Sequence, residues 1–204
     1  MERQLMMTGI GGQGVQLAAR MITLAALAEG RHVQLFGGYG GMMRGGDTAA
    51  TIVVGDAPVE SPPTIGATWS AIVMHHDYWE PTQRRLRPGS IVLVNTTVFE
   101  HEVDWSPYLL VEVPATELAG TVGSVMTASM IMAGAYAAVT GLVTVDSLVA
   151  AVGEVLPEYR QQHRELNYKA LHAGFDAAPH GLVDAWPDDA DTQADADAEA
   201  GSTR

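Results

Sequence analysis

Short apolar runs alternate with segments of helical periodicity along the first half of the chain. Six runs rich in Val, Ile, Leu and Met predict strands, at residues 4–8, 33–36, 48–54, 70–75, 90–95 and 109–113. Apolar positions spaced three and four apart predict helices over residues 15–29 and 79–86. Because strands that alternate with helices favour an α/β fold, we expect a mostly parallel sheet flanked by helices on both faces.

Beyond Pro114 the pattern is helical to the end of the predicted core. No residue from 119 to 145 carries a charge, a length that could cross a bilayer. We expect a single buried helix instead, because small residues dominate the stretch and acids flank it. Two further helices close the domain. Thr144 is the expected N-cap of the first, and the second spans residues 160–173. A stripe of small residues would let another element approach the uncharged helix closely: Ser129, Ala133, Ala137 and Gly141.

Charge divides the chain unevenly. The formal net charge is −13, and residues 184–204 contribute −6 of it with seven acids against Arg204, which leaves −7 for the rest. This balance argues against nucleic acid or an anionic membrane as a partner. We expect one domain over residues 1–178 and an acidic, low-complexity, disordered tail over residues 179–204. The chain has no cysteine and opens on no signal-like segment, so we expect a cytoplasmic protein without cysteine-held clusters.

The most informative local feature is a glycine-rich turn between the first predicted strand and helix. Gly9, Gly11 and Gly14 satisfy G-x-G-x-x-G, with Gly12 and Gln13 between them. Such a turn presents backbone N–H groups at the positive end of a helix dipole and suits a phosphate. A tight strand-to-helix connection is the plainer interpretation. A dinucleotide site would also need an acid after the second strand, where residues 35–38 read Leu-Phe-Gly-Gly.

A second glycine-rich stretch, residues 37–46, is predicted to be a flexible loop at the same edge of the sheet. It ends in Arg44, Gly45 and Gly46. The arginine is expected either to clamp a carboxylate or phosphate, or to be a solvated charge beside Asp47. Because parallel strands end at one edge, we expect Gln13 and Arg44 to face one shared cleft.

Other catalytic signals are missing. His75, His76 and Asp77 are interpreted as the end of a strand, where neighbouring side chains point to opposite faces and cannot share one ion. The sequence contains no zinc-binding helix motif, no G-x-S-x-G, no P-loop and no thiamine-diphosphate signature. We therefore assign no catalytic residue and no metal site to this chain alone.

Taken together, the blocks resemble the gamma subunit, or gamma domain, of the 2-oxoacid:ferredoxin oxidoreductases, which act on pyruvate, ketoisovalerate, 2-oxoglutarate and indolepyruvate. The resemblance covers about residues 5–175. Three places depart from the family pattern: Gly41-Met42 replaces Pro-Glu, Ser124 replaces an Asn after Gly123, and Ser129 replaces a helix Asn. The matching blocks are residues 9–14, Gly38-Tyr39-Gly40, Arg44-Gly45-Gly46, Ser61-Pro62, residues 113–119, residues 130–135 and Leu166-Asn167.

The resemblance implies a Rossmann-like α/β subunit that is inactive alone within a larger oxidoreductase. It implies thiamine diphosphate and iron–sulfur clusters on alpha and beta subunits, with a ferredoxin-like delta subunit in some assemblies and ferredoxin as electron acceptor. It also implies a coenzyme A contact at the two glycine blocks, although a subunit interface would explain them nearly as well. The alternatives are a stand-alone Rossmann-like nucleotide-binding module and a purely structural subunit.

Overall fold

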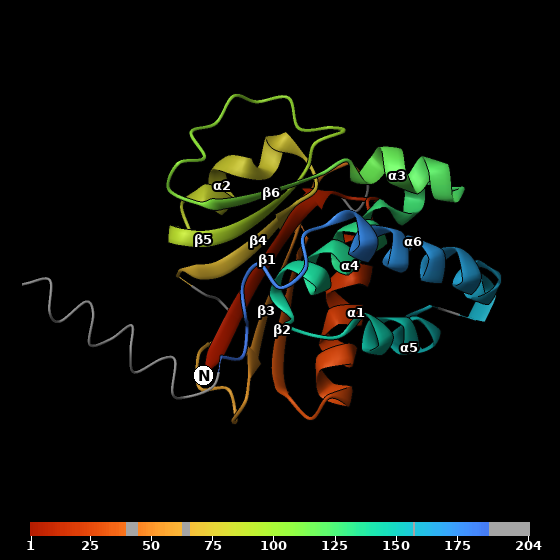
Figure 1. Cartoon of the computed structure of the whole chain (residues 1–204), viewed down its shortest axis with the longest axis horizontal. Coiled ribbons are helices and arrows are strands. Elements are labelled where there is room, and N and C mark those ends of the chain that lie inside the picture. The colour runs from red at the N-terminus through yellow and green to blue at the C-terminus, as the bar shows by residue number, and fades with distance from the viewer. Residues whose placement is uncertain (40–44, 63–65, 157, 188–204) are drawn as a thin grey trace, which may run out of the picture.

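The computed structural model describes residues 1–39, 45–62, 66–156 and 158–187 (Figure 1). The strands are β1 Glu2–Ile10, β2 His32–Tyr39, β3 Asp47–Gly55, β4 Thr68–Val73, β5 Leu86–Asn95 and β6 Leu109–Val113. The α-helices are α1 Val15–Ala28, α2 Trp79–Gln83, α3 Ala115–Val122, α4 Ala128–Thr140, α5 Val145–Val155 and α6 Arg164–Ala177. Short 3-10 helices lie at η1 His76–Tyr78, η2 Val125–Thr127 and η3 Glu158–His163.

The strands form one twisted sheet in the order β2-β3-β1-β4-β5-β6. Strands β1, β4, β5 and β6 are parallel to one another, whereas β3 runs antiparallel to both β1 and β2. Five strands therefore point the same way, which confirms the mostly parallel α/β fold. The insertion of β3 between β1 and β2 was not predicted.

The second glycine-rich stretch begins as strand rather than loop. Gly37 and Gly38 pair with Ala50 and Ala49 in the β2–β3 hairpin, so the predicted flexible loop starts too early. The Gln16 amide explains the glycine at 37, because a β-carbon there would lie 2.5 Å from Gln16 Oε1. Gln16 Nε2 in turn donates to the Ala49 carbonyl at 2.7 Å. This side chain anchors α1 to the hairpin.

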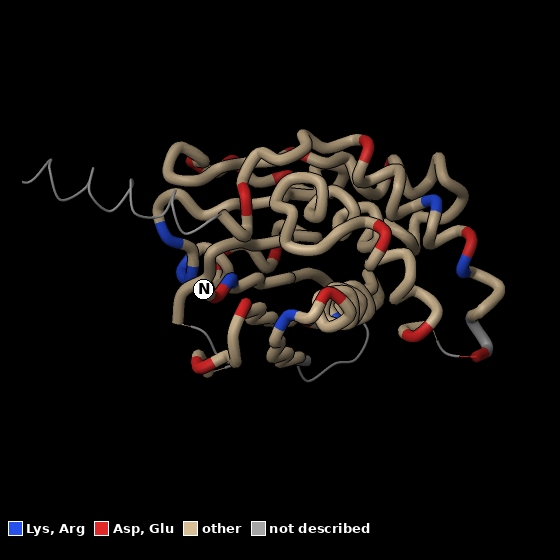
Figure 2. The backbone as a smooth tube through the Cα atoms, turned by 60° about the horizontal axis from the view of Figure 1, so that its bottom comes forward, with Lys and Arg blue, Asp and Glu red and all other residues tan. Residues whose placement is uncertain are grey.

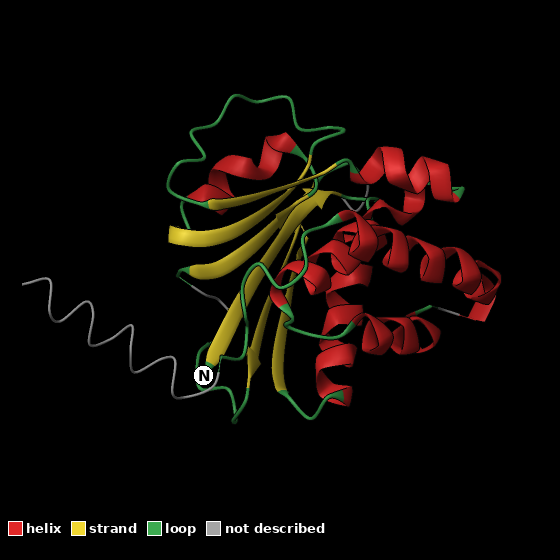
Figure 3. Cartoon of the chain, viewed as in Figure 1, coloured by secondary structure: helices red, strands yellow, loops and turns green. Residues whose placement is uncertain are grey.

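Both faces of the sheet are covered, but unequally (Figure 3). The alternation of side chains sends Ile72 and Leu93 into the large core shared with α1, α4 and the outer helices. Val73 and Val94 point the other way, into a smaller aromatic cluster built on Trp79 of α2 and the segment before β6. Acidic residues (red) and basic residues (blue) are both distributed along the described chain (Figure 2).

The uncharged stretch forms two helices, so the expectation of one continuous helix is wrong. Helix α3 ends at Gly123, whose φ of +130° favours glycine, and the Ser124 hydroxyl then accepts from Met126 N–H to start η2. Helix α4 follows, and all of its residues are buried. No helix in the described ranges is long and apolar enough to cross a membrane.

The chain beyond α6 continues across the end of α4. Residues 179–187, which the sequence analysis assigned to the tail, include the fully buried Ala185 and the half-buried Trp186. The Trp186 indole N–H donates to the Leu142 carbonyl at 3.1 Å, and the Arg31 guanidinium lies 3.8 Å from the centre of its ring. Residues 188–204, the rest of the predicted tail, lie outside the described residues.

Candidate functional site

The carboxyl edge of the sheet brings the two glycine blocks and the end of β4 together. The chain leaves β1 for α1 and the β2–β3 hairpin on one side, whereas it leaves β4 for α2 and β5 on the other. Open α/β sheets bind their ligands at such a reversal of strand order. The reversal between β1 and β4 is therefore the place in the fold where a ligand is expected.

Glycine is required at two positions of the first turn. Gly12 and Gly14 adopt φ values of +111° and +83°, in the left-handed region that side chains disfavour. Gly14 also caps α1, and a β-carbon there would lie 2.5 Å from the hydroxyl oxygen of Ser129 in α4. The turn therefore fixes the close approach of the N-terminal ends of α1 and α4.

The Gln13 side chain holds the turn together from inside. Its Oε1 accepts from the Ile10 N–H at 2.8 Å, and its Nε2 donates to the Met74 carbonyl at 3.3 Å. Gly9 leaves room for this amide, because a β-carbon at that position would lie 2.6 Å from Gln13 Oε1. Gln13 therefore connects β1 to the residue after β4, and its amide is used within the protein.

The second glycine block lies directly beside the first. The Gly11 N–H donates to the Gly46 carbonyl at 2.8 Å, and the Gly45 N–H donates to the Gly11 carbonyl at 3.1 Å. This pair of bonds brings the two sequence blocks together, as expected for loops at one edge. Arg44 lies outside the described residues, although it adjoins Gly45 in sequence.

Few donors of the turn remain available to a ligand. The N–H groups of Ile10, Gly11 and Gln13 are bonded within the protein, whereas those of Gly12 and Gly14 reach no acceptor among the described residues. The Ser129 hydroxyl is 1% exposed and likewise has no partner in the described part of the chain. Two backbone donors and one hydroxyl at the positive end of α1 suit an anion.

Replacing Gln13 with alanine is expected to lower the free energy of unfolding by roughly 1–3 kcal/mol, because the Ile10 N–H then loses its acceptor. Urea denaturation of the full chain measures the change. The control is Gln162→Ala, at an exposed position of η3. Equal stability of the two variants would show that Gln13 does not brace the turn.

The histidines after β4 lie closer together than the sequence suggested. Strand β4 ends at Val73, and His75 is extended while His76 begins η1, so the alternation of a strand does not apply to them. The ring centroids of His75 and His76 are 4.3 Å apart. Burial, and then the neighbouring His76, lowers the pKa of His75.

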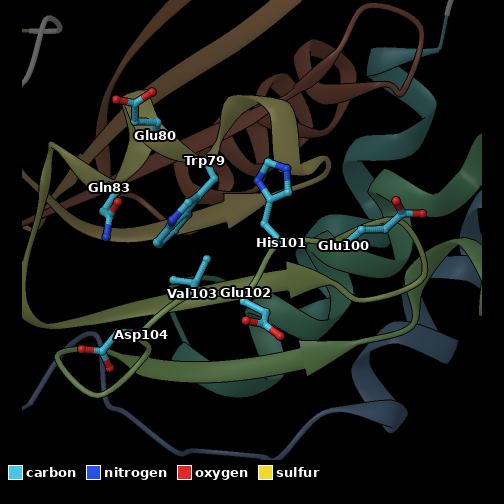
Figure 4. A pocket seen from close by; sticks show the side chains of 8 residues that line it. All are labelled: Trp79, Glu80, Gln83, Glu100, His101, Glu102, Val103 and Asp104. Carbon is cyan, nitrogen blue, oxygen red and sulfur yellow. The ribbon is translucent and has the colours of Figure 1, made fainter.

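A pocket of about 520 Å³ opens next to these histidines, on the side of the sheet covered by α2 (Figure 4). Sequence reasoning did not find it, because its walls come from α2 and from the irregular segment between β5 and β6. Its lining residues are Trp79, Glu80, Gln83, Glu100, His101, Glu102, Val103 and Asp104.

Residues 4–177 match the family described as pyruvate ferredoxin/flavodoxin oxidoreductase. The chain belongs to this family. It is 31% identical over 175 residues to the pyruvate/ketoisovalerate oxidoreductases common subunit gamma of Pyrococcus abyssi, an alignment that covers 82% of this chain and 92% of that protein. The family resemblance drawn from the glycine blocks is thereby confirmed, and the chain is a gamma-type subunit of a 2-oxoacid:ferredoxin oxidoreductase.

Solved structures agree with this assignment. The gamma subunit of keto/oxoacid ferredoxin oxidoreductase from Geobacter sulfurreducens superposes with a TM-score of 0.73 at 25% identity, and covers 86% of this chain and 98% of its own. A second solved structure is a 2-oxoglutarate:ferredoxin oxidoreductase from Magnetococcus marinus with 2-oxoglutarate, coenzyme A and succinyl-CoA bound. It superposes with a TM-score of 0.77 at 15% identity, and the alignment covers 87% of this chain and 31% of that chain. The second likeness shows the shared fold.

Proposed function

We propose that this gamma-type subunit supports the coenzyme A-dependent oxidative decarboxylation of a 2-oxoacid to an acyl-CoA, with ferredoxin as electron acceptor. The family match over residues 4–177 carries the proposal. The chain lacks cysteine and a thiamine-diphosphate signature, which agrees with thiamine diphosphate and iron–sulfur clusters on alpha and beta subunits. A chain without cysteine also needs no oxidising compartment, which agrees with a cytoplasmic complex.

We assign to the paired glycine blocks a contact with the phosphate groups of coenzyme A. The N–H groups of Gly12 and Gly14, which reach no acceptor among the described residues, the Ser129 hydroxyl and the N-terminus of α1 are all suited to a polyanion. The Magnetococcus relative, which shares this fold, was solved with coenzyme A bound. The dinucleotide alternative has less support, because the carboxyl end of β2, residues 35–39, contains no acid.

Exposed apolar side chains near the same edge suit contact with other subunits. Val125 and Met126, in the 3-10 turn just before α4, are 56% and 65% exposed. Phe36, on the edge strand β2, is 48% exposed. Large apolar side chains exposed beside a polar site are typical of surfaces that another protein covers.

The proposal is tested by co-expressing the chain with the alpha and beta subunits of a 2-oxoacid:ferredoxin oxidoreductase from the same organism. The complex should reduce ferredoxin or a viologen dye in a reaction that requires both a 2-oxoacid and coenzyme A. The chain alone should show no 2-oxoacid-dependent dye reduction and no thiamine diphosphate binding. Activity of the isolated chain, or full activity of the other subunits without it, would overturn the proposal.

Replacing Arg44 with alanine in that complex is expected to raise the KM for coenzyme A roughly tenfold to a hundredfold. The reason is the loss of a charge-assisted hydrogen bond of about 1.5–3 kcal/mol next to Gly45. Arg44→Lys should recover part of the loss, since an ammonium lacks the planar fork. Steady-state kinetics measure the effect, with Arg20→Ala at an exposed position of α1 as control. Identical KM values for all three variants would leave Arg44 without a role.

A further inference from the structure

The side chains that follow β4 form a compact group of metal-ligand atoms. Asp77 Oδ1 lies 3.3 Å from His76 Nε2, and Asp77 Oδ2 lies 3.5 Å from His75 Nδ1. One ligand atom from each of the three residues lies within 4.8 Å of the others. Each imidazole is 19% exposed, whereas the Asp77 side chain is 56% exposed. The group is therefore held by the protein on one side and open to solvent on the other.

Hydrogen bonds fix the protons of both rings. His76 Nδ1 lies 2.8 Å from the Val98 carbonyl oxygen, which can only accept, so Nδ1 carries the hydrogen and Nε2 is left with a lone pair. His75 Nδ1 accepts from the Asp77 N–H at 3.3 Å, so its proton lies on Nε2, and a metal ion at Nδ1 would replace this long hydrogen bond. A second ring nitrogen bonded to a backbone carbonyl is the usual support of a metal-binding histidine.

The His76 Nε2 lone pair therefore faces Asp77 Oδ1 at 3.3 Å, and two acceptors at this distance repel each other unless a proton or a metal ion lies between them. We propose that His75, His76 and Asp77 bind a divalent transition-metal ion of the zinc class. Imidazole and carboxylate are ligands that zinc takes, and ligands of a tetrahedral zinc lie about 3.4 Å apart. Binding would require side-chain rotations that close the remaining span of up to 4.8 Å.

The surroundings of the three residues favour a cation. Glu100, Glu102 and Asp104 line the adjacent pocket (Figure 4), where their charges attract metal ions. His101 from the same wall stacks beside His76 with ring centroids 4.5 Å apart, but it does not belong to the group of converging atoms. The exposed side of Asp77 leaves a coordination position for water.

The site lies next to the glycine turn without being part of it. Met74, which accepts the hydrogen bond of Gln13, directly precedes His75. A bound metal would therefore hold the end of β4 where the turn rests on it. The alternative is a protonated His76 paired with Asp77, which would neutralise the same oxygens without any metal.

Zinc titration of the full chain, prepared untagged and metal-free, tests the proposal. Competition with a chromogenic chelator should show one zinc ion bound per chain. Asp77→Ala and His76→Ala should each weaken zinc binding at least about tenfold to a hundredfold, the loss that outer-shell partners alone produce. His180→Ala, an exposed histidine distant in sequence, and His101→Ala should retain wild-type affinity.

Cobalt(II) provides a second readout that does not depend on affinity. The wild-type chain should show the visible absorption of a cobalt ion with nitrogen ligands and low coordination number, and Asp77→Ala should change that spectrum. Because Asp77 is exposed, its replacement is expected to leave the fold intact, which circular dichroism verifies. Failure of the wild type to bind one equivalent of zinc, or equal affinity of Asp77→Ala and His180→Ala, would overturn the proposal in favour of the protonated pair.

Discussion

Replacing Gly174 with alanine is expected to lower the free energy of unfolding by at least about 3 kcal/mol, because helix α6 packs backbone to backbone on α4 at this position. A β-carbon on Gly174 would lie 1.9 Å from the Ile131 carbonyl oxygen and 2.6 Å from its carbon. These are backbone atoms that cannot rotate aside, so the two helices would have to separate and leave their shared core badly packed.

The contact is reciprocal. On the facing helix, a β-carbon on Gly134 would lie 2.0 Å from the Leu171 carbonyl oxygen. The uncharged helix therefore makes a close approach at Gly134, whereas a β-carbon at Gly141, in the stripe of Ser129, Ala133, Ala137 and Gly141, would meet nothing within 4 Å. Of that stripe, Ser129 makes a close approach of its own, to Gly14. We expect Gly134→Ala to be as damaging as Gly174→Ala.

Denaturant unfolding of the full chain measures both changes. Gly120→Ala in α3 is the matched control, because its β-carbon would meet only Val125 Cγ1, at 3.9 Å. That replacement should leave stability unchanged or raise it by up to about 1 kcal/mol, since alanine favours helix. Stabilities of Gly174→Ala and Gly120→Ala within 1 kcal/mol of each other would contradict the close packing of α4 and α6.

Periodicity located the strands and the long helices because both depend on local spacing. The runs around Leu5, Ile52, Ile72 and Leu93 are all central strands of the core. Strand order depends instead on which elements pair at a distance. The glycines at 37 and 38 read as a loop, yet they pair with β3, and the hairpin then places β3 against β1.

The same limit applies to the site. Sequence spacing predicted that the two glycine blocks meet, and the bonds between Gly11, Gly45 and Gly46 join them. It did not reveal that the Gln13 amide is used inside the turn, because its partners Ile10 and Met74 are set by the approach of β1 and β4. It also extended β4 to His75, two residues beyond its end at Val73, and so separated two rings that lie together.

One missed boundary did carry a local signal. Gly123 followed by Ser124 is a helix stop followed by a residue that caps the next turn, and the structure uses both. The absence of charge from 119 to 145 hid this break, since burial on all sides removes the polar face that marks a helix. Hydrophobicity indicated that the segment is buried, but not that it contains two helices.

Ending the chain after Ala178 is expected to destabilise the protein by at least about 3 kcal/mol, whereas ending it after Pro187 should have little effect. Residues 181–185 supply N–H donors to the carbonyl groups of the last turn of α4, where Ala138, Val139 and Thr140 are buried. Each buried carbonyl left without a partner costs about 1–3 kcal/mol. The bonded pairs are Gly181 with Ala138, Val183 with Val139 and Ala185 with Thr140, at 2.8, 3.0 and 2.9 Å.

Further contacts of the same segment add to the effect. Arg3 donates through Nε to the Ala185 carbonyl at 2.8 Å, and Trp186 covers the core beside Arg31. Removal of residues 179–204 would therefore expose part of the core next to the start of β1. Residues 188–204 contain six acids and no apolar side chain larger than alanine, so their removal takes little apolar surface from the protein.

Thermal unfolding of the two truncated chains, compared with the full chain, separates these contributions. The chain ending at Pro187 should keep the full-length midpoint, and the reconstituted complex should keep its activity within about a factor of two. The chain ending at Ala178 should melt markedly lower, and Trp186→Ala in the full chain should fall between the two. A lost partner subunit or a large drop in midpoint on removing residues 188–204 alone would show that the acidic tail has a role in assembly. Equal midpoints for both truncations would show that residues 179–187 do not cap α4.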